Sequence, residues 1–184
     1  MLSMAKKSKG DLAFVVQKHR ATSLHYDFRL QIGDVMPSWA IPKGPTLDNM
    51  VKRLALPTTD HLMKYRHFEG IIPGGEYGAG HVMIWDEGTY NPEIEISKGV
   101  RQEITDKRKA QQVARQSYSD GNLKFILYGK KLRGSFALVR TKNFAGRNDA
   151  WLLIKHLDKF CKKGYDANDY GFSALSGLSL ADIK

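Results

Sequence analysis

One stretch, residues 14–30, constrains the fold more than any other part of the sequence. Its second half alternates apolar and polar side chains without a break, which predicts a β-strand with one face in a core. The apolar face of this strand carries Leu24, Tyr26, Phe28 and Leu30. The polar face carries His25, Asp27 and Arg29. A polar turn at residues 20–23 predicts a hairpin, and the same alternation in the preceding strand places Gln17 and His19 beside this polar face.

The polar side of the predicted hairpin combines residue types that bind divalent transition metals. Two imidazoles and one carboxylate, from His19, His25 and Asp27, suit Mn, Fe, Ni, Cu or Zn, and the carboxylate favours the harder of these ions. Arg29 follows Asp27 on the same face, and its guanidinium can pair with a phosphate or carboxylate that also touches the metal. A solvated strand face would explain any one of these residues, but four such groups on adjacent strands favour a site.

Further short strands, separated by turns rich in Gly and Pro, indicate an all-β sandwich or barrel. We predict these strands at residues 39–41, 122–128, 135–140 and 151–155. The chain should leave the sheet at residues 41–45, because proline lacks the donor that a central strand needs. Glycines at residues 74–80 lack the order of a phosphate-binding loop and predict turns at the rim of the sheet. Residues 97–118 are rich in Lys, Arg, Gln and Ala, which predicts a solvent-facing helix.

Length, charge and cysteine content narrow the class of protein. The 184 residues predict one domain, and the net charge of +10, from 29 Lys and Arg against 19 Asp and Glu, favours nucleic acid as the partner over an anionic membrane. A single cysteine, Cys161, excludes an intramolecular disulfide and favours a reducing compartment. The sequence shows neither a secretory signal nor an apolar stretch of about 20 residues, the length that spans a bilayer. We therefore expect a cytoplasmic protein with no membrane association.

Three segments follow from these patterns. Residues 1–10 carry three lysines and predict a mobile basic arm. Residues 11–159 contain every predicted strand and form the expected domain. Residues 160–184 are polar, with no clear strand or helix, and we predict a C-terminal tail of unknown role.

Several motifs occur in a specific order along the chain. They are His19, His25-x-Asp27-x-Arg29, the run at 39–44, Asp60-His61, the run at 68–70 and the Gly-rich run at 72–80. In order and spacing they resemble the 3′-phosphoesterase module of bacterial and archaeal DNA ligase D, over about residues 14–157. The resemblance implies a compact β-barrel core with short flanking helices. It also implies that residues 97–118 are an insertion and that residues 160–184 depart from the family pattern.

The resemblance further implies roles for individual residues around one pocket. The implied ligands of a Mn²⁺ ion are His19, His25 and Asp27. The implied catalytic residues, two of which contact the phosphate, are Arg29, His61 and Tyr65. The implied substrate-binding residues are Gln17, Lys43 and Arg53. Because imidazole titrates near neutral pH, His61 is the best candidate for a general acid or base, with a simple phosphate contact as the alternative.

The activity implied by the resemblance is processing of 3′ ends in DNA repair and end joining. A terminal ribonucleoside is removed from a DNA or RNA-tipped primer-template, and the remaining 3′-phosphate is hydrolysed to a hydroxyl that can be ligated. The chain has no Lys-x-Asp-Gly adenylation motif, so we expect a free-standing module whose ligase partner acts in trans. The acidic and basic residues that the family carries upstream of the barrel have no clear match here, so the phosphatase step is the firmer expectation.

Two other functions fit part of the sequence. His25-x-Asp27 followed by His61 has the order of ligands found in 2-His-1-carboxylate iron oxygenases, although His19 would then have no role. A basic β-barrel could also bind nucleic acid without cutting it, as OB-folds do.

Overall fold

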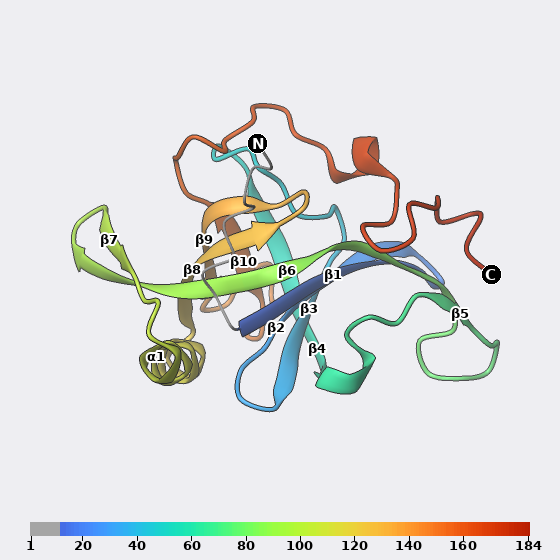
Figure 1. Ribbon diagram of the computed structural model, residues 1–184, viewed down its shortest axis with the longest axis horizontal. Coiled ribbons are helices and arrows are strands. Elements are labelled where there is room, and N and C mark those ends of the chain that lie inside the picture. Colours follow the sequence, from blue (N-terminus) through green and yellow to red (C-terminus); the bar gives the residue numbers. More distant parts are fainter. Residues whose placement is uncertain (1–11) are drawn as a thin grey trace, which may run out of the picture.

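The chain folds mainly into β-strands, as expected, and the computed structural model describes residues 12–184 (Figure 1). The expected arm at residues 1–10 lies outside the described residues. The strands are β1 (Leu12–Arg20), β2 (Leu24–Leu30), β3 (Val35–Ile41), β4 (Lys52–Leu62), β5 (Gly70–Ile72), β6 (Gly80–Ser97), β7 (Val100–Glu103), β8 (Asn122–Gly129), β9 (Arg133–Arg140) and β10 (Trp151–Lys155). The helical elements are η1 (Met63–Tyr65), α1 (Lys107–Asp120) and η2 (Ala167–Tyr170).

Eight of these strands close into an antiparallel barrel. They pair in the order β1-β2-β3-β4-β10-β9-β8-β6, and a further pairing of β6 with β1 closes the ring. Strands β5 and β7 pair with the two ends of the long strand β6. The expected barrel core is therefore confirmed. Within residues 12–184, no helix is both long and apolar enough to span a lipid bilayer.

The first hairpin has the predicted register. Strands β1 and β2 pair so that His19 lies opposite His25 and Gln17 lies opposite Asp27. The alternate residues Phe14 and Phe28 belong to the core cluster inside the barrel. Because successive side chains in a strand point to opposite faces, the polar residues of the hairpin face outward from the barrel.

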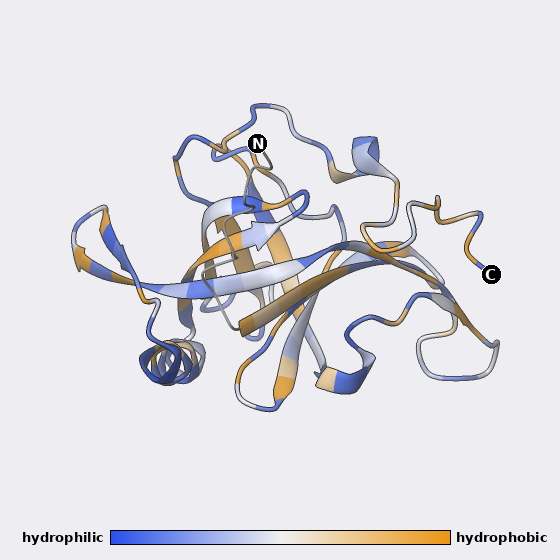
Figure 2. Cartoon of the chain, in the orientation of Figure 1, coloured by the Kyte–Doolittle hydropathy of each residue, from blue (hydrophilic) through white to orange (hydrophobic). Residues whose placement is uncertain are grey.

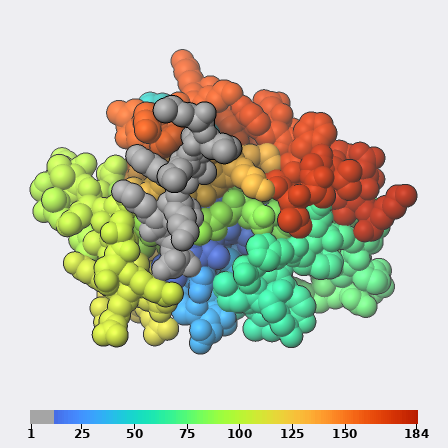
Figure 3. Space-filling view, viewed as in Figure 1, coloured from blue at the N-terminus to red at the C-terminus, as the bar shows by residue number. Residues whose placement is uncertain are grey.

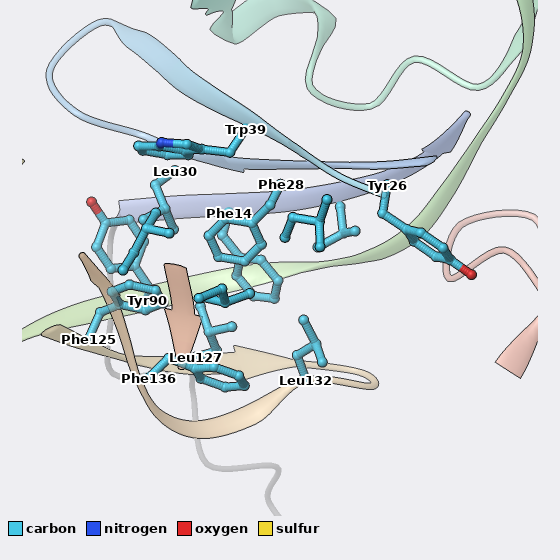
Figure 4. Packing of buried hydrophobic residues seen from close by; sticks show 14 of the residues in the cluster. Phe14, Tyr26, Phe28, Leu30, Trp39, Tyr90, Phe125, Leu127, Leu132 and Phe136 are labelled. Atoms are coloured by element: carbon cyan, nitrogen blue, oxygen red, sulfur yellow. The ribbon is translucent and has the colours of Figure 1, made fainter. Parts of the chain in front are cut away.

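Aromatic side chains fill the barrel, as the close-up of the core shows (Figure 4). The ring of Phe28 stacks on Phe125 with the centroids 6.0 Å apart, and Phe125 stacks on Phe136 at 6.2 Å. These rings come from β2, β8 and β9, so they join strands that are distant in the sequence. Their burial removes large apolar areas from water and fixes the wall on which the polar residues stand.

The predicted helix at residues 97–118 forms in part. The first part of this range contains strand β7 instead of a helix, and helix α1 occupies Lys107–Asp120. Hydrophilic residues cover most of the surface of α1 (Figure 2). Asp106 caps the helix by accepting a hydrogen bond from the backbone N–H of Lys109 at 2.8 Å. The helix ends at Gly121, whose φ of +71° is the left-handed conformation that glycine adopts readily. The capping side chain, rather than composition, sets where this helix begins.

The C-terminal tail packs onto the barrel as an ordered part of the domain (Figure 3). Four of its residues belong to the core cluster: Tyr165, Ala167, Leu180 and Ile183. The indole N–H of Trp85 donates to the carbonyl of Tyr170 at 2.9 Å. The backbone N–H of Gly164 donates to the carboxylate of Asp48 at 2.8 Å. The tail therefore has a structural role that its polar composition does not reveal.

A polar network links β6 and β9 to the residues that follow β10. The hydroxyl of Ser135 donates to Oε1 of Glu93 at 2.5 Å and accepts from Nδ1 of His156 at 2.7 Å. The ammonium of Lys155 is buried and lies 2.7 Å from Oδ2 of Asp158. Burial, with nearby positive charges that include Lys155, lowers the pKa of His156 to about 4, so this imidazole is neutral at pH 7.

Candidate metal centre and phosphate pocket

The three sequence-predicted metal ligands converge on the outer wall of the barrel. One ligand atom from each of His19, His25 and Asp27 lies within 4.8 Å of the other two. His61 does not belong to this group, so among the described residues the second nitrogen ligand, beside that of His25, comes from His19. This arrangement argues against the ligand order of an iron oxygenase, which required His61 in place of His19.

Backbone carbonyls fix the tautomers of both histidines. Nε2 of His19 lies 2.7 Å from the carbonyl of Gly78, and Nδ1 of His25 lies 3.2 Å from the carbonyl of Ser23. A carbonyl can only accept, so these nitrogens carry the protons. The lone pairs then sit on Nδ1 of His19 and Nε2 of His25, the atoms that lie 3.5 and 3.4 Å from the two carboxylate oxygens of Asp27. Such outer contacts are typical of histidines that bind metal.

The electrostatics of the cluster also suit a cation. Burial opposes ionisation of Asp27, but the adjacent imidazoles of His19 and His25 and the positive charge of Arg29 outweigh this effect and hold the pKa of the carboxyl well below its usual range. The neighbouring carboxylate of Asp27 raises the pKa of His25, although burial opposes this shift. A buried carboxylate that stays ionised and two oriented imidazoles fit a divalent transition metal.

Arg29 stands beside the cluster with its guanidinium held on three sides. Its Nε donates to Oε1 of Gln17 and its Nη1 to Oγ of Ser38, both at 2.8 Å. Its Nη2 lies 3.4 Å from Oδ2 of Asp27. Burial lowers the pKa of Arg29 and the carboxylate of Asp27 opposes that shift, but a guanidinium remains charged in proteins. The side chain is only 11% exposed, so its position is fixed before any ligand binds.

Gln17 lies on the floor of the pocket with both ends of its amide paired. Its oxygen accepts from Arg29, and its Nε2 donates to the carbonyl of Phe68 at 3.0 Å. The next residue, Glu69, accepts from the hydroxyl of Ser173 in the C-terminal tail at 2.6 Å. A chain of contacts therefore runs from the tail to Arg29, and Gln17 holds the arginine in place.

His61 and Tyr65 come from the end of β4 and from η1. Nε2 of His61 lies 3.3 Å from the carbonyl of Tyr65, which leaves Nδ1 of the neutral ring as an acceptor. Burial lowers the pKa of His61, and the positive charge of Arg29 lowers it further. The ring of Tyr65 is 48% exposed and packs edge-on against His61, with the centroids 6.0 Å apart. Both side chains line the pocket, as expected from the sequence.

The pocket has a volume of about 470 Å³. It is lined by the three predicted metal ligands, called the metal cluster below, and by Arg29, His61 and Tyr65. Lys43 and Arg53 are outside it. They line a second hollow of about 540 Å³, together with Lys52, between the turn that follows β3, the start of β4 and β10. Nε of Arg53 is buried there without a hydrogen-bond partner. The expectation that Lys43 and Arg53 surround the same pocket as the predicted metal ligands is therefore corrected, because Lys43 follows the end of β3 and Arg53 lies at the start of β4. Their role in substrate binding stays a prediction.

Sequence reasoning missed several residues that the fold brings to the site. Ser38 holds Arg29 without lining the pocket, because the register of β2 with β3 places the two residues opposite each other. Thr59 and Tyr77 line the pocket, from β4 and from the loop between β5 and β6. The position of Tyr77 within the Gly-rich run was the only signal available in the sequence, and it predicted a turn without placing that turn over the metal cluster.

Comparison with known proteins gives matches across most of the chain. The family described as "DNA Ligase D 3'-phosphoesterase domain" matches residues 17–140. The multifunctional non-homologous end joining protein LigD of Pseudomonas aeruginosa is 43% identical over 153 residues, which cover 83% of this chain and 16% of that protein. The corresponding DNA repair protein LigD of Mycobacterium tuberculosis is 39% identical over 184 residues, covering 98% of this chain and 21% of its own length.

The extent of these matches bears on the expectation that residues 160–184 depart from the family pattern. The Mycobacterium match includes most of residues 160–184, so the tail is not a departure from every relative. A third relative, the LigD of Mycolicibacterium smegmatis, is 38% identical over 146 residues, or 79% of this chain and 17% of that protein. The chain thus spans about a fifth or less of the length of these relatives. From its sequence match over residues 17–140, the chain belongs to the DNA ligase D 3′-phosphoesterase domain family.

Proposed function

We propose that this protein is a metal-dependent phosphoesterase that processes the 3′ ends of nucleic acid in DNA repair by end joining. One observation carries the proposal: a preformed His-His-Asp cluster and a buried, fixed arginine share one pocket. The ligand that suits both groups is an anion with several oxygens, such as a phosphate monoester or diester.

His19, His25 and Asp27 would hold the metal, for which we propose Mn²⁺, because two imidazoles and one carboxylate accept the harder transition ions. When bound, the ion would neutralise charge on the phosphate and activate a water molecule. The carbonyls of Gly78 and Ser23 keep the two histidines oriented for that task.

Arg29 supplies fixed positive charge next to the reacting phosphate. Its Nε and Nη1 are occupied by Gln17 and Ser38, so the remaining donors of the guanidinium face the pocket. Negative charge accumulates on the phosphate oxygens as the ester bond breaks, and a donor held in place beforehand needs no reorganisation to stabilise it. We propose that this is the main contribution of Arg29.

In this proposal, His61 is the residue that takes up a proton during the reaction. A lowered pKa keeps the imidazole neutral at pH 7, and the contact with the carbonyl of Tyr65 leaves Nδ1 as an acceptor. A neutral imidazole suits a general base better than a general acid. A role as a phosphate contact only is the alternative, and the pH dependence of kcat separates the two.

We propose two substrates for this pocket. One is a 3′-phosphate, which is hydrolysed to a 3′-hydroxyl, and the other is a terminal ribonucleoside, which is removed to leave a 3′-phosphate. The relatives are non-homologous end joining proteins by name, which supports a role in joining DNA ends, with any ligase acting in trans. A net charge of +10 supports a nucleic acid substrate.

The decisive experiment supplies a 3′-phosphorylated primer-template with Mn²⁺ and measures release of inorganic phosphate. Parallel reactions use primers that end in one ribonucleotide or only in deoxynucleotides. We expect turnover of the 3′-phosphate, and faster resection of the ribonucleotide end than of the deoxynucleotide end. Tight binding of all three primers without turnover would instead identify a binding module, and a requirement for 2-oxoglutarate would identify an oxygenase.

A further inference from the structure

Tyr77 stands at the mouth of the metal pocket with its ring in solvent. The side chain is 86% exposed, although it lines the same cavity as the metal cluster and Arg29. Its hydroxyl lies 3.4 Å from Oγ1 of Thr59 on β4. Tyr77 belongs to the loop between β5 and β6, so this contact reaches across the opening from one rim to the other.

The loop that carries Tyr77 is tied to the metal cluster. The carbonyl of Gly78, the next residue, accepts from Nε2 of His19 at 2.7 Å. On the other side, the backbone N–H of Glu76 donates to the carbonyl of Pro73 at 3.3 Å in a tight turn. Gly78 has a φ of +78°, a conformation that most side chains disfavour. The position of the tyrosine relative to the metal ligands is therefore set by backbone contacts on both sides.

The faces of this ring are available for a ligand, unlike those of Tyr65, whose ring has other partners. The ring of Tyr65 packs against His61, and the ammonium of Lys64 lies over it at 4.8 Å. Within residues 12–184, neither an aromatic ring nor a cation stacks on Tyr77. An exposed aromatic face beside a phosphate site is the arrangement with which proteins bind unpaired nucleotides, because every base has a π-face.

We propose that Tyr77 stacks on the nucleobase of the 3′-terminal nucleotide whose phosphate occupies the pocket. This inference rests on the proposed function, since it assumes that a nucleotide phosphate binds beside Arg29. Stacking would let the site accept any of the bases while rejecting phosphate esters that have no base. Tyr77 would thus determine the class of substrate, while Arg29 and the metal cluster act on the phosphate.

The test compares two 3′-phosphorylated primers that differ only at the terminal nucleotide, which carries its base in one and lacks it in the other. For Tyr77→Ala we expect KM for the base-bearing end to rise about fivefold or more, the scale of base stacking on an aromatic side chain, and KM for the baseless end to stay unchanged. Tyr77→Phe keeps the ring and loses only the contact with Thr59, so it should behave as the unmodified protein. Phe172→Ala removes an exposed ring from the C-terminal tail and is the matched control.

A second measurement reports stacking without turnover. The fluorescence of 2-aminopurine, placed as the terminal base of a 3′-phosphorylated primer, should be quenched on binding to the unmodified protein and to Tyr77→Phe, and less on binding to Tyr77→Ala. Quenching that depends on Tyr77 in the absence of phosphate release would overturn the proposed hydrolysis and support the stacking. Equal quenching by all three proteins, or an equal change of KM for both primers in Tyr77→Ala, would overturn the stacking.

Discussion

Oε1 of Gln17 accepts a hydrogen bond from Nε of Arg29 at 2.8 Å, and both side chains are almost completely buried. The other end of the amide donates to the carbonyl of Phe68, so Gln17 connects Arg29 to the segment that follows η1. Because the guanidinium has only limited freedom to rotate between Gln17, Ser38 and Asp27, its remaining donors point in one direction before substrate arrives. Pre-organisation of this kind is what stabilises a transition state at little cost.

Replacement of Gln17 by alanine should therefore slow every reaction of the pocket to the same degree. We expect kcat for Gln17→Ala to fall on the order of tenfold or more, as for other partners that orient active-site groups. Initial rates on 3′-phosphate, ribonucleotide and deoxynucleotide ends would show unchanged ratios between substrates. A selective loss on the ribonucleotide end would show instead that Gln17 recognises the sugar.

Metal binding should raise thermal stability through the cluster alone. A ligand that binds only the folded state at 100 times its Kd stabilises that state by about 2.7 kcal/mol. We expect Mn²⁺ to raise the Tm of the unmodified protein and of Arg29→Lys, because a guanidinium has no lone pair to offer a metal ion. His25→Ala should lose the increase.

His67→Ala is the control for this measurement, because His67 is an exposed histidine paired with Glu87 at 2.8 Å, outside the cluster. It should keep the full increase in Tm. An undiminished increase in His25→Ala would contradict the assignment of the ligands, whereas loss of the increase in Arg29→Lys would place Arg29 among the groups that hold the metal.

Much of the barrel could be predicted from the sequence because its strands are short runs rich in apolar residues that turn-forming residues separate. Strand β10 has the predicted bounds, and the hairpin of β8 and β9 differs from prediction by one residue at the end of β8 and two at the start of β9. The polar face of β1 and β2 was predictable from the alternation in β2, since parity fixes which side chains share a face. Local sequence patterns are sufficient to predict the contacts of a residue when its neighbours lie in the same hairpin.

Contacts between distant segments could not be predicted in this way. Ser38 reaches Arg29 only through the register of β3 on β2, and the carbonyl of Gly78 reaches His19 across 59 residues of chain. Lys43 and Arg53 are polar residues in the right part of the sequence, yet the geometry of β3 and β4 places them in a different hollow. The tail is polar in composition, but the core buries four of its apolar residues, Tyr165, Ala167, Leu180 and Ile183.

The second hollow should contribute to binding of the nucleic acid backbone. Lys43, Lys52 and Arg53 concentrate positive charge there. Each phosphate contact adds roughly 0.7 to 0.9 to the magnitude of the slope of log K against log salt. We expect the slope to become shallower by about that amount in Lys43→Gln and in Arg53→Gln if each residue makes one contact.

Lys98→Gln is the matched control for the salt titration, because it removes one charge at the exposed turn between β6 and β7. Fluorescence anisotropy with a labelled primer-template over a range of salt concentrations provides the measurement. Equal slopes for Lys43→Gln, Arg53→Gln and Lys98→Gln would show that the hollow lies away from the bound strand.

His156 should make the fold less stable in mild acid. Its pKa is about 4 in the folded protein, against an ordinary value of 6.5, so between these pH values the unfolded chain binds a proton that the folded protein does not. The contribution of His156 to the free energy of unfolding is therefore complete above pH 6.5. It decreases as the pH falls from 6.5 to about 4, and it does not change further below about 4. Asparagine can present an amide N–H to Ser135 and does not titrate, so His156→Asn should show a smaller loss over the same range.

Urea unfolding in the presence of a chelator, at several pH values between about 7 and about 4.5, measures this effect without a contribution from bound metal. His61 also has a lowered pKa and contributes in the same direction in both proteins, so the difference between the two curves isolates His156. The two proteins are compared by the pH dependence of their stability, since the substitution can also change stability at pH 7. Parallel curves for His156→Asn and the unmodified protein would show that the neutral imidazole between Ser135 and the surrounding cations does not determine acid stability.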